Sequence, residues 1–283
     1  MGNLAGLSGM SRDLYDAAYS WFGHFKGGLA SSAVVGCAGF SALSGSSLAA
    51  ALTMGRVSLP EMRRYNYHRG LATGAIAAGG TLGILIPPSA GFVVYAILTE
   101  ESIGRLFMAG ILPGLLLTGM FIFTIWIIVL QEPGKAPQSA VALPLRQRIT
   151  SLRNATWIIG IIGITIGGIY AGVFSAVEAA GIGAFLALIV TFIRGALTFA
   201  GLAEVANNTL KSTGTVFMIL FGAFVFKTFI GFSGVPFAMT NWVSTQGFSG
   251  IEVLIAILVI FMILGLSLIH ISEPTRPRLI SYA

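Results

Sequence analysis

An apolar stretch covering residues 71–98 contains, near its midpoint, the sequence Gly-Ile-Leu-Ile-Pro-Pro-Ser, which begins at Gly83. Proline has no backbone N–H, so Pro87 cannot donate to the carbonyl of Gly83, and Pro88 cannot donate to that of Ile84. Lipid cannot supply the missing donors, and such carbonyls are tolerated in hydrocarbon only inside protein or beside a watery cavity. Unwound carbonyls of this kind can coordinate cations. The break therefore predicts a binding site at mid-membrane depth.

The composition is typical of a protein embedded in a bilayer. Hydrophobic residues make up 55% of the chain and charged residues 9%, and the mean hydropathy is +0.89. Several apolar stretches are long enough to cross a membrane. We therefore predict an all-α integral membrane protein with several spans, broken helices or re-entrant hairpins. Cys37 is the single cysteine, which excludes an intrachain disulfide and, in practice, a thiolate metal site.

A second interruption lies in the apolar residues 28–55, where Ser44-Gly45-Ser46-Ser47 is too polar and too small for an ordinary lipid-facing span. A re-entrant hairpin or a broken helix fits better, with Ser46 or Ser47 as the N-cap of the next helix. Hydroxyls and freed carbonyls supply oxygens to a dehydrated monovalent cation without a full negative charge. The predicted binding site for such a cation comprises Ser44, Gly45, Ser46, Ser47, Gly83, Ile84, Pro87, Pro88 and Ser89. The alternative is that the serines hydrogen-bond across a helix-packing interface.

The formal charge of +6 does not indicate a nucleic-acid partner, because the basic residues are scattered among the connections between apolar runs. Four lie within residues 56–69 and four within residues 131–153, whereas the intervening link carries Glu100, Glu101 and a single arginine, Arg105. The positive-inside rule places the two basic connections, 56–69 and 131–153, in the cytoplasm. The apolar pair 71–98 and 106–130 would then leave the cytoplasmic side and return to it.

The remaining segments suggest two halves, residues 1–130 and residues 154–266, joined by a linker at 131–153 that contains three prolines and has no apolar period. Residues 11–24 have apolar side chains at helical spacing, with Ser11 as the expected N-cap of an amphipathic surface helix. The apolar segments of the second half are 156–174, 179–193, 216–232 and 252–268. The polar, proline-rich tail at 267–283 looks unrelated to the rest and is expected to be non-native.

Isolated ionisable residues give weaker signals. Glu178, with Ser175 before it, is either an intramembrane functional carboxylate or an interfacial residue at a helix N-terminus. Lys227 can snorkel from a helix end. His24 and His68 have no second ligand at metal spacing, so we expect no metal other than the monovalent cation at the two interruptions. The sequence contains no HExxH, GxSxG, GxxxxGK[ST] or dinucleotide GxGxxG motif, and we expect neither an enzyme nor a cofactor.

Several motifs, in this order, resemble those of the large membrane subunit of tripartite ATP-independent periplasmic (TRAP) transporters. They are Gly27-Gly28-Leu29-Ala30, Ser44-Gly45-Ser46-Ser47, Leu59-Pro60-Glu61-Met62, residues 80–89, Ser102-Ile103-Gly104-Arg105-Leu106-Phe107 and Ala109-Gly110-Ile111-Leu112-Pro113-Gly114. The resemblance extends from residue 2 to about residue 266 and is specific through Gly114.

This resemblance implies a multi-span helical transporter of the ion-transporter superfamily, with two inverted repeats, re-entrant hairpins and elevator-like movement. It also implies sodium-coupled uptake of an organic acid, such as a C4-dicarboxylate or sialic acid, across the bacterial inner membrane. The implied partners are a periplasmic substrate-binding protein and a small four-helix membrane subunit. The family's sodium and substrate region falls on Ser44, Ser46, Ser47, Gly83, Ile84 and Pro87.

The second half departs from the family pattern. The family usually shows Gly-x-Phe-Thr-Pro-Thr-Glu-Ala where this chain has Gly-Val-Phe-Ser-Ala-Val-Glu-Ala, which keeps Ser175 and Glu178 but loses the proline and a threonine. A later hairpin and the start of the first repeat are not seen, so we expect a fragment that does not transport alone. Two alternatives to a TRAP permease are a standalone dicarboxylate and sodium symporter without a binding protein and a non-transporting membrane scaffold.

Overall fold

The computed structural model describes residues 1–137 and 143–272, with side chains through residue 265. The described residues divide into two units, Met1–Leu220 and the part of the chain from Phe221 onward, and each is treated by itself. The helices that begin in the first unit are α1 (Gly2–Leu7), α2 (Met10–Phe22), α3 (Gly28–Ser44), α4 (Ser47–Arg64), α5 (Arg69–Leu85), α6 (Ala90–Thr99), α7 (Ile103–Gln131), the 3-10 turn η1 (Pro133–Lys135), α8 (Leu145–Asn154), α9 (Thr156–Tyr170), α10 (Ala176–Ile193) and α11 (Phe199–Phe232). The second unit contains the end of α11, then α12 (Val235–Thr245) and α13 (Gly250–Ser272).

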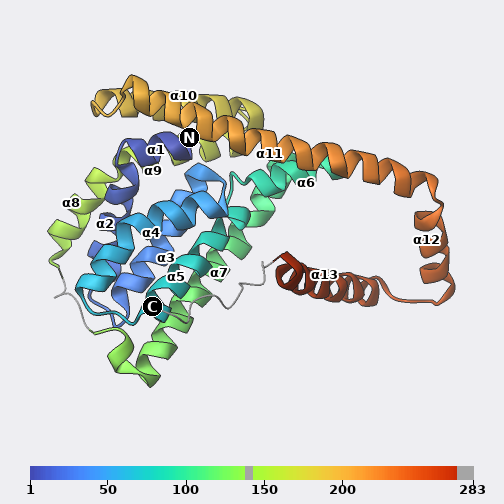
Figure 1. Cartoon of the computed structure of the whole chain (residues 1–283), viewed down its shortest axis with the longest axis horizontal. Helices are drawn as coiled ribbons and strands as arrows, with labels where there is room; N and C mark the ends of the chain where they lie inside the picture. The colour runs from blue at the N-terminus through green and yellow to red at the C-terminus, as the bar shows by residue number, and fades with distance from the viewer. Residues whose placement is uncertain (138–142, 273–283) are drawn as a thin grey trace, which may run out of the picture. The chain divides into compact units, whose positions relative to one another are not determined.

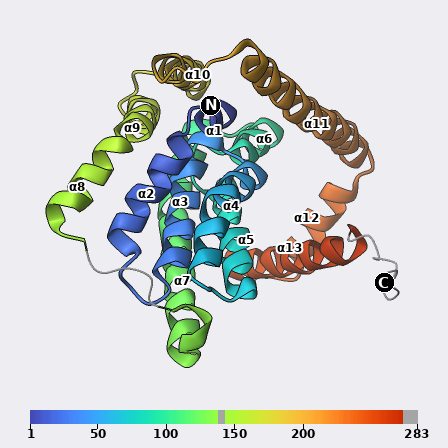
Figure 2. The same cartoon turned by 60° about the vertical axis from the view of Figure 1, so that its left-hand side comes forward.

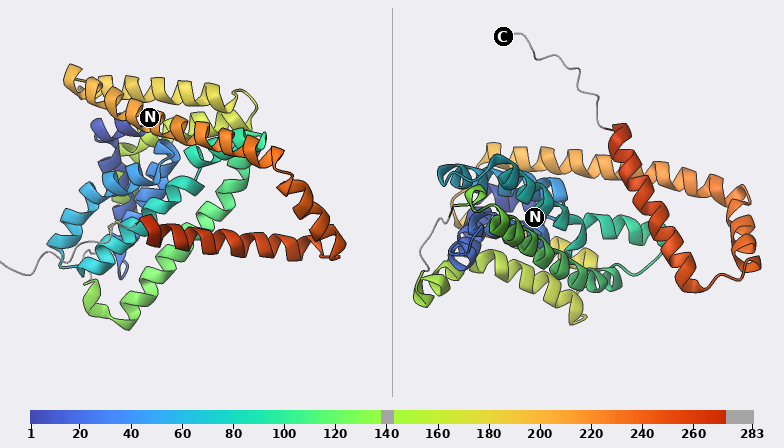
Figure 3. Two further views of the ribbon diagram at one scale, coloured as in Figure 1. Left: turned by 45° about the vertical axis from the view of Figure 1, so that its right-hand side comes forward. Right: turned by 90° about the horizontal axis from the view of Figure 1, so that it is seen from below.

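Helix α3 is the centre of the first unit. It packs against α2, α4, α5 and α7, as Figures 1 and 2 show. Buried residues account for 13 of its 17 positions, which is the pattern of a helix that is apolar all round. Its Phe40 and Leu43 join Met54 of α4 and Leu82 of α5 among the largest fully buried side chains. The two further views in Figure 3 show the long α7, in green, beside these blue and cyan helices.

The amphipathic helix predicted at residues 11–24 is confirmed as α2, which buries Tyr15 and Ala18, while its place near the membrane surface stays a prediction. The predicted N-cap was wrong. Gly9, at φ +77°, occupies that position, and its carbonyl accepts the backbone N–H groups of Arg12 and Asp13. Glycine adopts this left-handed conformation without a side-chain clash, so the helix begins before Ser11. Ser11 lies inside the helix and is buried.

The predicted interruption in residues 28–55 is confirmed as an α3–α4 hairpin that turns at Gly45 and Ser46. Helix α4 is longer than the sequence indicated, because it continues through Pro60 to Arg64. Arg63 and Arg64 therefore lie in the last helical turn and not in a loop, where they interact favourably with the negative end of the helix dipole. A proline removes a single backbone donor, and packing of α4 on α3 and α5 outweighs that loss.

His68 and Lys135, one from each basic segment, lie at the same end of the first unit. The backbone N–H of His68, just before α5, donates to the carbonyl oxygen of Lys135, just after α7, at 2.8 Å. The helices between them run away from this end and return to it, as the sequence predicts for the pair 71–98 and 106–130. The acidic link, with Glu100 and Glu101, joins α6 to α7.

The predicted linker is partly helical, since α8 occupies Leu145–Asn154 and packs on α2. The four apolar segments expected in the second half correspond to α9, α10, part of α11 and α13. Helix α11 begins 17 residues before the expected segment, and α12 was not predicted. Helix α13 continues to Ser272, whereas residues 273–283 of the expected tail lie outside the described residues. The proposed boundaries between halves stay a prediction.

Four helical segments of the described chain are long and apolar enough to cross a membrane: Arg69–Thr99, Ile103–Gln131, Ala176–Ile193 and Phe199–Phe232. A fifth candidate is the pair α8 and α9, which is bent by 64°. The first of these spans contains the Pro-Pro break between α5 and α6. The described fold is therefore that of an all-helical, multi-span membrane protein with interrupted helices.

Candidate functional site

The two interruptions predicted from the sequence lie against each other in the first unit. The backbone N–H of Ala90, at the start of α6, donates to the carbonyl oxygen of Gly45 at 3.1 Å. Gly45 adopts φ +61°, and a Cβ atom built on it would lie 2.5 Å from the carbonyl oxygen of Pro88. Glycine is therefore required at position 45 for two reasons. Its backbone is left-handed, and the other break approaches too closely to leave room for a side chain.

The other side of the α3–α4 turn rests on α5. A Cβ atom on Gly83 would lie 2.6 Å from both the carbonyl carbon of Ser46 and the backbone nitrogen of Ser47. Ser46 is the N-cap of α4, and its Oγ accepts the backbone N–H of Ala49 at 3.4 Å. The structure thus confirms the capping role predicted for Ser46. Ser47, in contrast, is the first residue of α4, and its backbone packs on α5.

The Pro-Pro break rearranges the hydrogen bonds that the helix loses. Helix α5 ends at Leu85, and the next residues contain a cis bond between Pro87 and Pro88. The Oγ of Ser89, which is 1% exposed, donates to the carbonyl oxygen of Ile84 at 2.5 Å. Of the two carbonyls deprived of helical donors, that of Ile84 therefore has a side-chain partner. The carbonyl of Gly83 still lacks its helical donor, because Pro87 has no N–H.

A cavity of about 140 Å³ lies where the breaks meet. Four of the predicted site residues line it: Ser44, Gly45, Pro88 and Ser89. The other predicted residues of this region do not line the cavity: Ser46, Ser47, Gly83, Ile84 and Pro87.

Two serine hydroxyls near the cavity have no hydrogen-bond partner among the described residues. The Oγ atoms of Ser44 and of Ser41, one turn earlier on α3, are both buried and unpaired. Leaving a buried hydroxyl unsatisfied costs about 1–3 kcal/mol, so such groups call for a ligand or a functional explanation. A desolvated cation would satisfy the Ser44 Oγ, and Ser89 and Thr165 supply the other side-chain hydroxyls among the residues that line the cavity, which are mostly apolar.

The second half contributes the opposite wall of this cavity. Thr165 of α9 and Ala176 and Ala179 of α10 are among the lining residues. The Thr165 Oγ1 donates to the carbonyl of Ile161 at 2.8 Å, which leaves its oxygen lone pairs available. The cavity is therefore formed by segments more than 100 positions apart in the sequence.

Ser175 and Glu178, the predicted second-half residues, form a capping box at the N-terminus of α10. The Glu178 carboxylate accepts the N–H and the hydroxyl of Ser175, both at 2.8 Å, and the Glu178 N–H donates to Ser175 Oγ at 3.3 Å. Both residues are exposed, and neither lines the cavity. The geometry matches the alternative of a helix-terminal carboxylate, while a role in ion binding stays a prediction. Ser249 and Glu252 repeat the same arrangement at the start of α13.

Sequence reasoning missed Ser41, Thr165 and Phe107 as neighbours of the site. Ser41 lies three positions before Ser44 on a helix, and that spacing was a usable signal. Thr165 and Phe107 have no local signature, since only the tertiary fold brings α7 and α9 to the breaks. Within the described ranges, no group of three or more His, Cys, Asp or Glu residues is placed to hold a metal ion.

Comparison with known proteins identifies the family. Residues 1–272 match the family described as "Tripartite ATP-independent periplasmic transporter, DctM component". The chain belongs to this family. The TRAP resemblance expected from the sequence motifs is thereby confirmed, over more of the chain than the motifs themselves cover.

Individual TRAP relatives agree with this assignment. The chain is 35% identical to the C4-dicarboxylate TRAP transporter large permease protein DctM of Pseudomonas aeruginosa, over 91% of this chain and 60% of the relative. It is 32% identical to the ectoine large permease TeaC of Halomonas elongata, over 88% of this chain and 58% of the relative. It is 30% identical to the sialic acid large permease SiaM of Vibrio cholerae, over 93% of this chain and 61% of the relative. The chain thus spans about three fifths of the length of these TRAP permeases.

Proposed function

We propose that this chain forms part of a permease that couples sodium entry to the uptake of an organic acid across the bacterial inner membrane. The observation that carries the proposal is the junction of the two breaks, where the Ser44 hydroxyl is buried, unpaired and next to a cavity of about 140 Å³. Serine hydroxyls and unwound carbonyls are the ligands that carriers offer to sodium. The ion is cargo of the transport cycle and not a resident cofactor.

Sodium at this junction would connect two helices that are otherwise joined there by a single backbone hydrogen bond. Ser44 and Gly45 end α3, whereas Pro88 and Ser89 precede α6, so an ion that binds oxygens from both stabilises the closed junction. A ligand shifts a conformational equilibrium only by its differential affinity for the two states. The proposed coupling is therefore that sodium favours the conformation in which the breaks touch, and that this conformation accepts the substrate.

The proposed substrate class is supported by relatives whose names refer to C4-dicarboxylates, ectoine and sialic acid, all of which carry a carboxylate. The family description also supports a periplasmic binding protein and a small membrane subunit as partners. It favours these over the alternative of a standalone symporter. The basic ends of α4, α5 and η1 would face the cytoplasm by the positive-inside rule.

The proposal is tested with the permease that carries this sequence, co-reconstituted in liposomes with its small subunit and binding protein. We expect an inward sodium gradient to drive uptake of a labelled organic acid, and a potassium gradient of equal size to leave uptake at background. Uptake that is indifferent to the sodium gradient would exclude sodium coupling. No uptake of any carboxylate, with sodium binding intact, would favour the scaffold alternative.

A further inference from the structure

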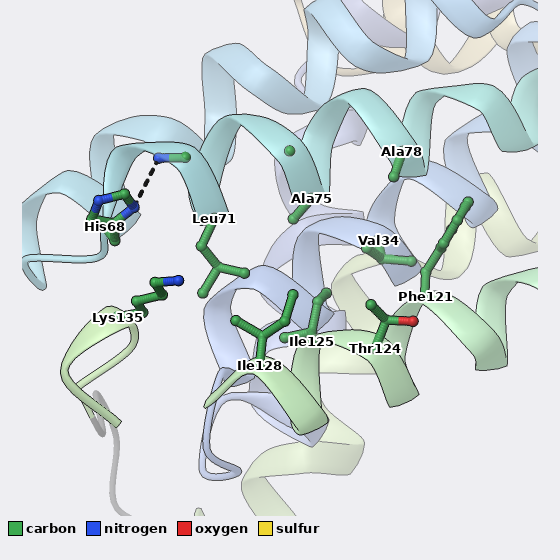
Figure 4. A pocket seen from close by; sticks show the side chains of 12 residues that line it. Val34, His68, Leu71, Ala75, Ala78, Phe121, Thr124, Ile125, Ile128 and Lys135 are labelled. Carbon is green, nitrogen blue, oxygen red and sulfur yellow. Dashed lines mark hydrogen bonds between the residues drawn. The ribbon is translucent and has the colours of Figure 1, made fainter. Parts of the chain in front are cut away.

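A second cavity in the first unit, of about 360 Å³, lies between α5 and α7 and is separate from the junction of the breaks. Figure 4 shows its two walls and its polar end. The walls are almost wholly apolar or small and consist of Val34, Gly70, Leu71, Gly74, Ala75, Ala78, Phe121, Thr124, Ile125 and Ile128. His68 and Lys135 close one end. We call this cavity the α5–α7 groove.

The α5–α7 groove lies along two membrane-spanning segments and starts at their shared end. Helix α5 opens the span Arg69–Thr99, and α7 forms the span Ile103–Gln131. The lining residues of α5 extend from Gly70 to Ala78, which is a rise of about 12 Å at 1.5 Å per residue. The polar end is therefore at the depth of lipid headgroups, and the apolar remainder is at the depth of acyl chains.

The polar end presents nitrogen donors that the protein fixes in place. The backbone N–H of His68 donates to the carbonyl of Lys135 at 2.8 Å, which holds the two residues together. The Nδ1 atom of His68 accepts the N–H of Gly70 at 3.2 Å, so the neutral ring carries its proton on Nε2. The Lys135 Nζ atom lies 2.6 Å from Glu132 Oε1. An ammonium has three donors, and this ion pair uses one of them.

We propose that the α5–α7 groove binds one anionic phospholipid. Its phosphate would accept hydrogen bonds from Lys135 Nζ and His68 Nε2, and one acyl chain would lie along the apolar walls. Basic pockets between membrane helices on the cytoplasmic side are a recurrent form of site for anionic headgroups. The inference goes beyond the transport function and does not depend on sodium coupling.

The hydrogen-bond donors at the polar end favour a lipid over a helix from a partner subunit. Gly70, Gly74 and Ala78 form a stripe of small residues that would also suit helix packing. An apolar partner helix, however, would cover the groove without offering an acceptor to the fixed donors of His68 and Lys135. A phospholipid satisfies the donors and fills the apolar volume with a single molecule.

The test is native mass spectrometry of the full chain, purified in detergent and supplied with phosphatidylglycerol or with phosphatidylcholine of the same acyl chains. We expect the wild type to retain one phosphatidylglycerol in preference to phosphatidylcholine. Lys135→Gln should weaken that retention about fivefold, the effect expected for one basic residue at a lipid surface. Arg146→Gln, which removes a basic residue of α8 outside the groove, should leave retention unchanged.

Two substitutions fill the groove from opposite walls. If one of the variants fails to fold, the other still tests whether the groove holds the lipid. Ala78→Phe on α5 and Thr124→Trp on α7 should each abolish retention of either lipid, with the helical circular dichroism preserved in at least one. Glycerol 3-phosphate, which has the headgroup phosphate without acyl chains, should not compete. Equal retention in the wild type, Lys135→Gln and both filled variants would overturn the proposal. So would full displacement by glycerol 3-phosphate, or loss of small-subunit binding in the filled variants with the lipid count unchanged.

Discussion

The backbone N–H of Ala90 donates to the carbonyl oxygen of Gly45 at 3.1 Å, and this bond joins two helix breaks that lie 45 positions apart in the sequence. It places the end of α3 against the start of α6 at the edge of a small cavity. Four residues of the two breaks, Ser44, Gly45, Pro88 and Ser89, line this cavity, and the Oγ of Ser44 is buried there without a partner. The site therefore depends on how closely the two backbones approach.

The first prediction concerns the backbone of that contact. Gly45→Ala adds a Cβ atom 2.5 Å from the Pro88 carbonyl oxygen at a residue with φ +61°. A left-handed non-glycine residue costs about 1–3 kcal/mol before the clash is counted. We expect a loss of about 3 kcal/mol of stability in detergent, measured by thermal unfolding followed by circular dichroism.

Gly119→Ala is the matched control for this substitution. Gly119 lies within α7, and a Cβ atom there would meet nothing within 4 Å. Replacing a helical glycine with alanine should be neutral or should stabilise by about 0.5–1 kcal/mol. An equal loss of stability in both variants would show that the backbones of Gly45 and Pro88 do not approach closely enough to exclude a Cβ atom.

The second prediction concerns the contact between α5 and the start of α4. Gly83→Ala places a Cβ atom 2.6 Å from the backbone of Ser46 and Ser47, which cannot rotate away as a side chain can. We expect α4 to move away from α5 and the thermal midpoint to fall. Gly163→Ala on α9, with open space at its Cβ position, should leave the midpoint within a degree or two of the wild type. A tolerated Gly83→Ala would argue against the close packing of the two breaks.

Much of this arrangement was predictable from local chemistry. Prolines at 87 and 88 in an apolar stretch dictate a break, and the serines around Gly45 dictate another with Ser46 as a cap. The hydrogen bond from Ser89 to Ile84 was not foreseen, because it replaces a helical donor by a side chain five positions away. The contribution of Thr165 to the cavity at the two breaks was not predictable either, since no local pattern links α9 to α3.

The limits of helices were less predictable than their existence. The basic residues within 56–69 indicate a connection between apolar runs, but packing of α4 on its neighbours keeps the segment helical to Arg64. The start of α11 was missed because residues 199–215 include charged and amide side chains that weaken the apolar signal. Tertiary packing decides such cases, and hydropathy alone cannot.

The third prediction concerns an ion pair that joins α2 to the end of α10. Arg194, which follows α10, places Nη1 2.6 Å from Asp13 Oδ2 of α2, and the side chains are only 23% and 25% exposed. The same guanidinium donates to the carbonyls of Ser8 at 3.3 Å and Asn154 at 3.5 Å. Because removal of Arg194 leaves a shielded carboxylate and two carbonyls without this partner, Arg194→Met should cost about 2–3 kcal/mol.

The comparison pair is Arg105 and Glu101, 3.5 Å apart, with side chains 75% and 55% exposed. An exposed pair of this kind contributes about 0–1 kcal/mol, so Arg105→Met should change the thermal midpoint little. A double-mutant cycle with Asp13→Asn and Arg194→Met should give a coupling energy above that of the Glu101–Arg105 pair. Equal coupling energies for the two pairs would mean that the Arg194–Asp13 ion pair does not stabilise the contact between α2 and the end of α10.

The fourth prediction isolates the proposed ion ligand. The Ser44 Oγ is buried without a partner, so Ser44→Ala removes an unsatisfied group and should not destabilise the sodium-free protein. Ser32→Ala, on the same helix, is the matched control, because the Ser32 Oγ is fully buried and already donates to the Gly28 carbonyl at 2.6 Å. Both substitutions remove a serine Oγ from α3, but only Ser44→Ala removes one from a residue that lines the cavity.

The most direct measurement is the thermal midpoint of the purified chain in sodium chloride and in potassium chloride at equal ionic strength. A bound ion stabilises the folded state by about 2.7 kcal/mol at one hundred times its dissociation constant. The account predicts a sodium-specific rise of the midpoint in the wild type and in Ser32→Ala, and its loss in Ser44→Ala. An equal rise in all three proteins, or none in the wild type, would contradict a sodium site at the junction of the two breaks.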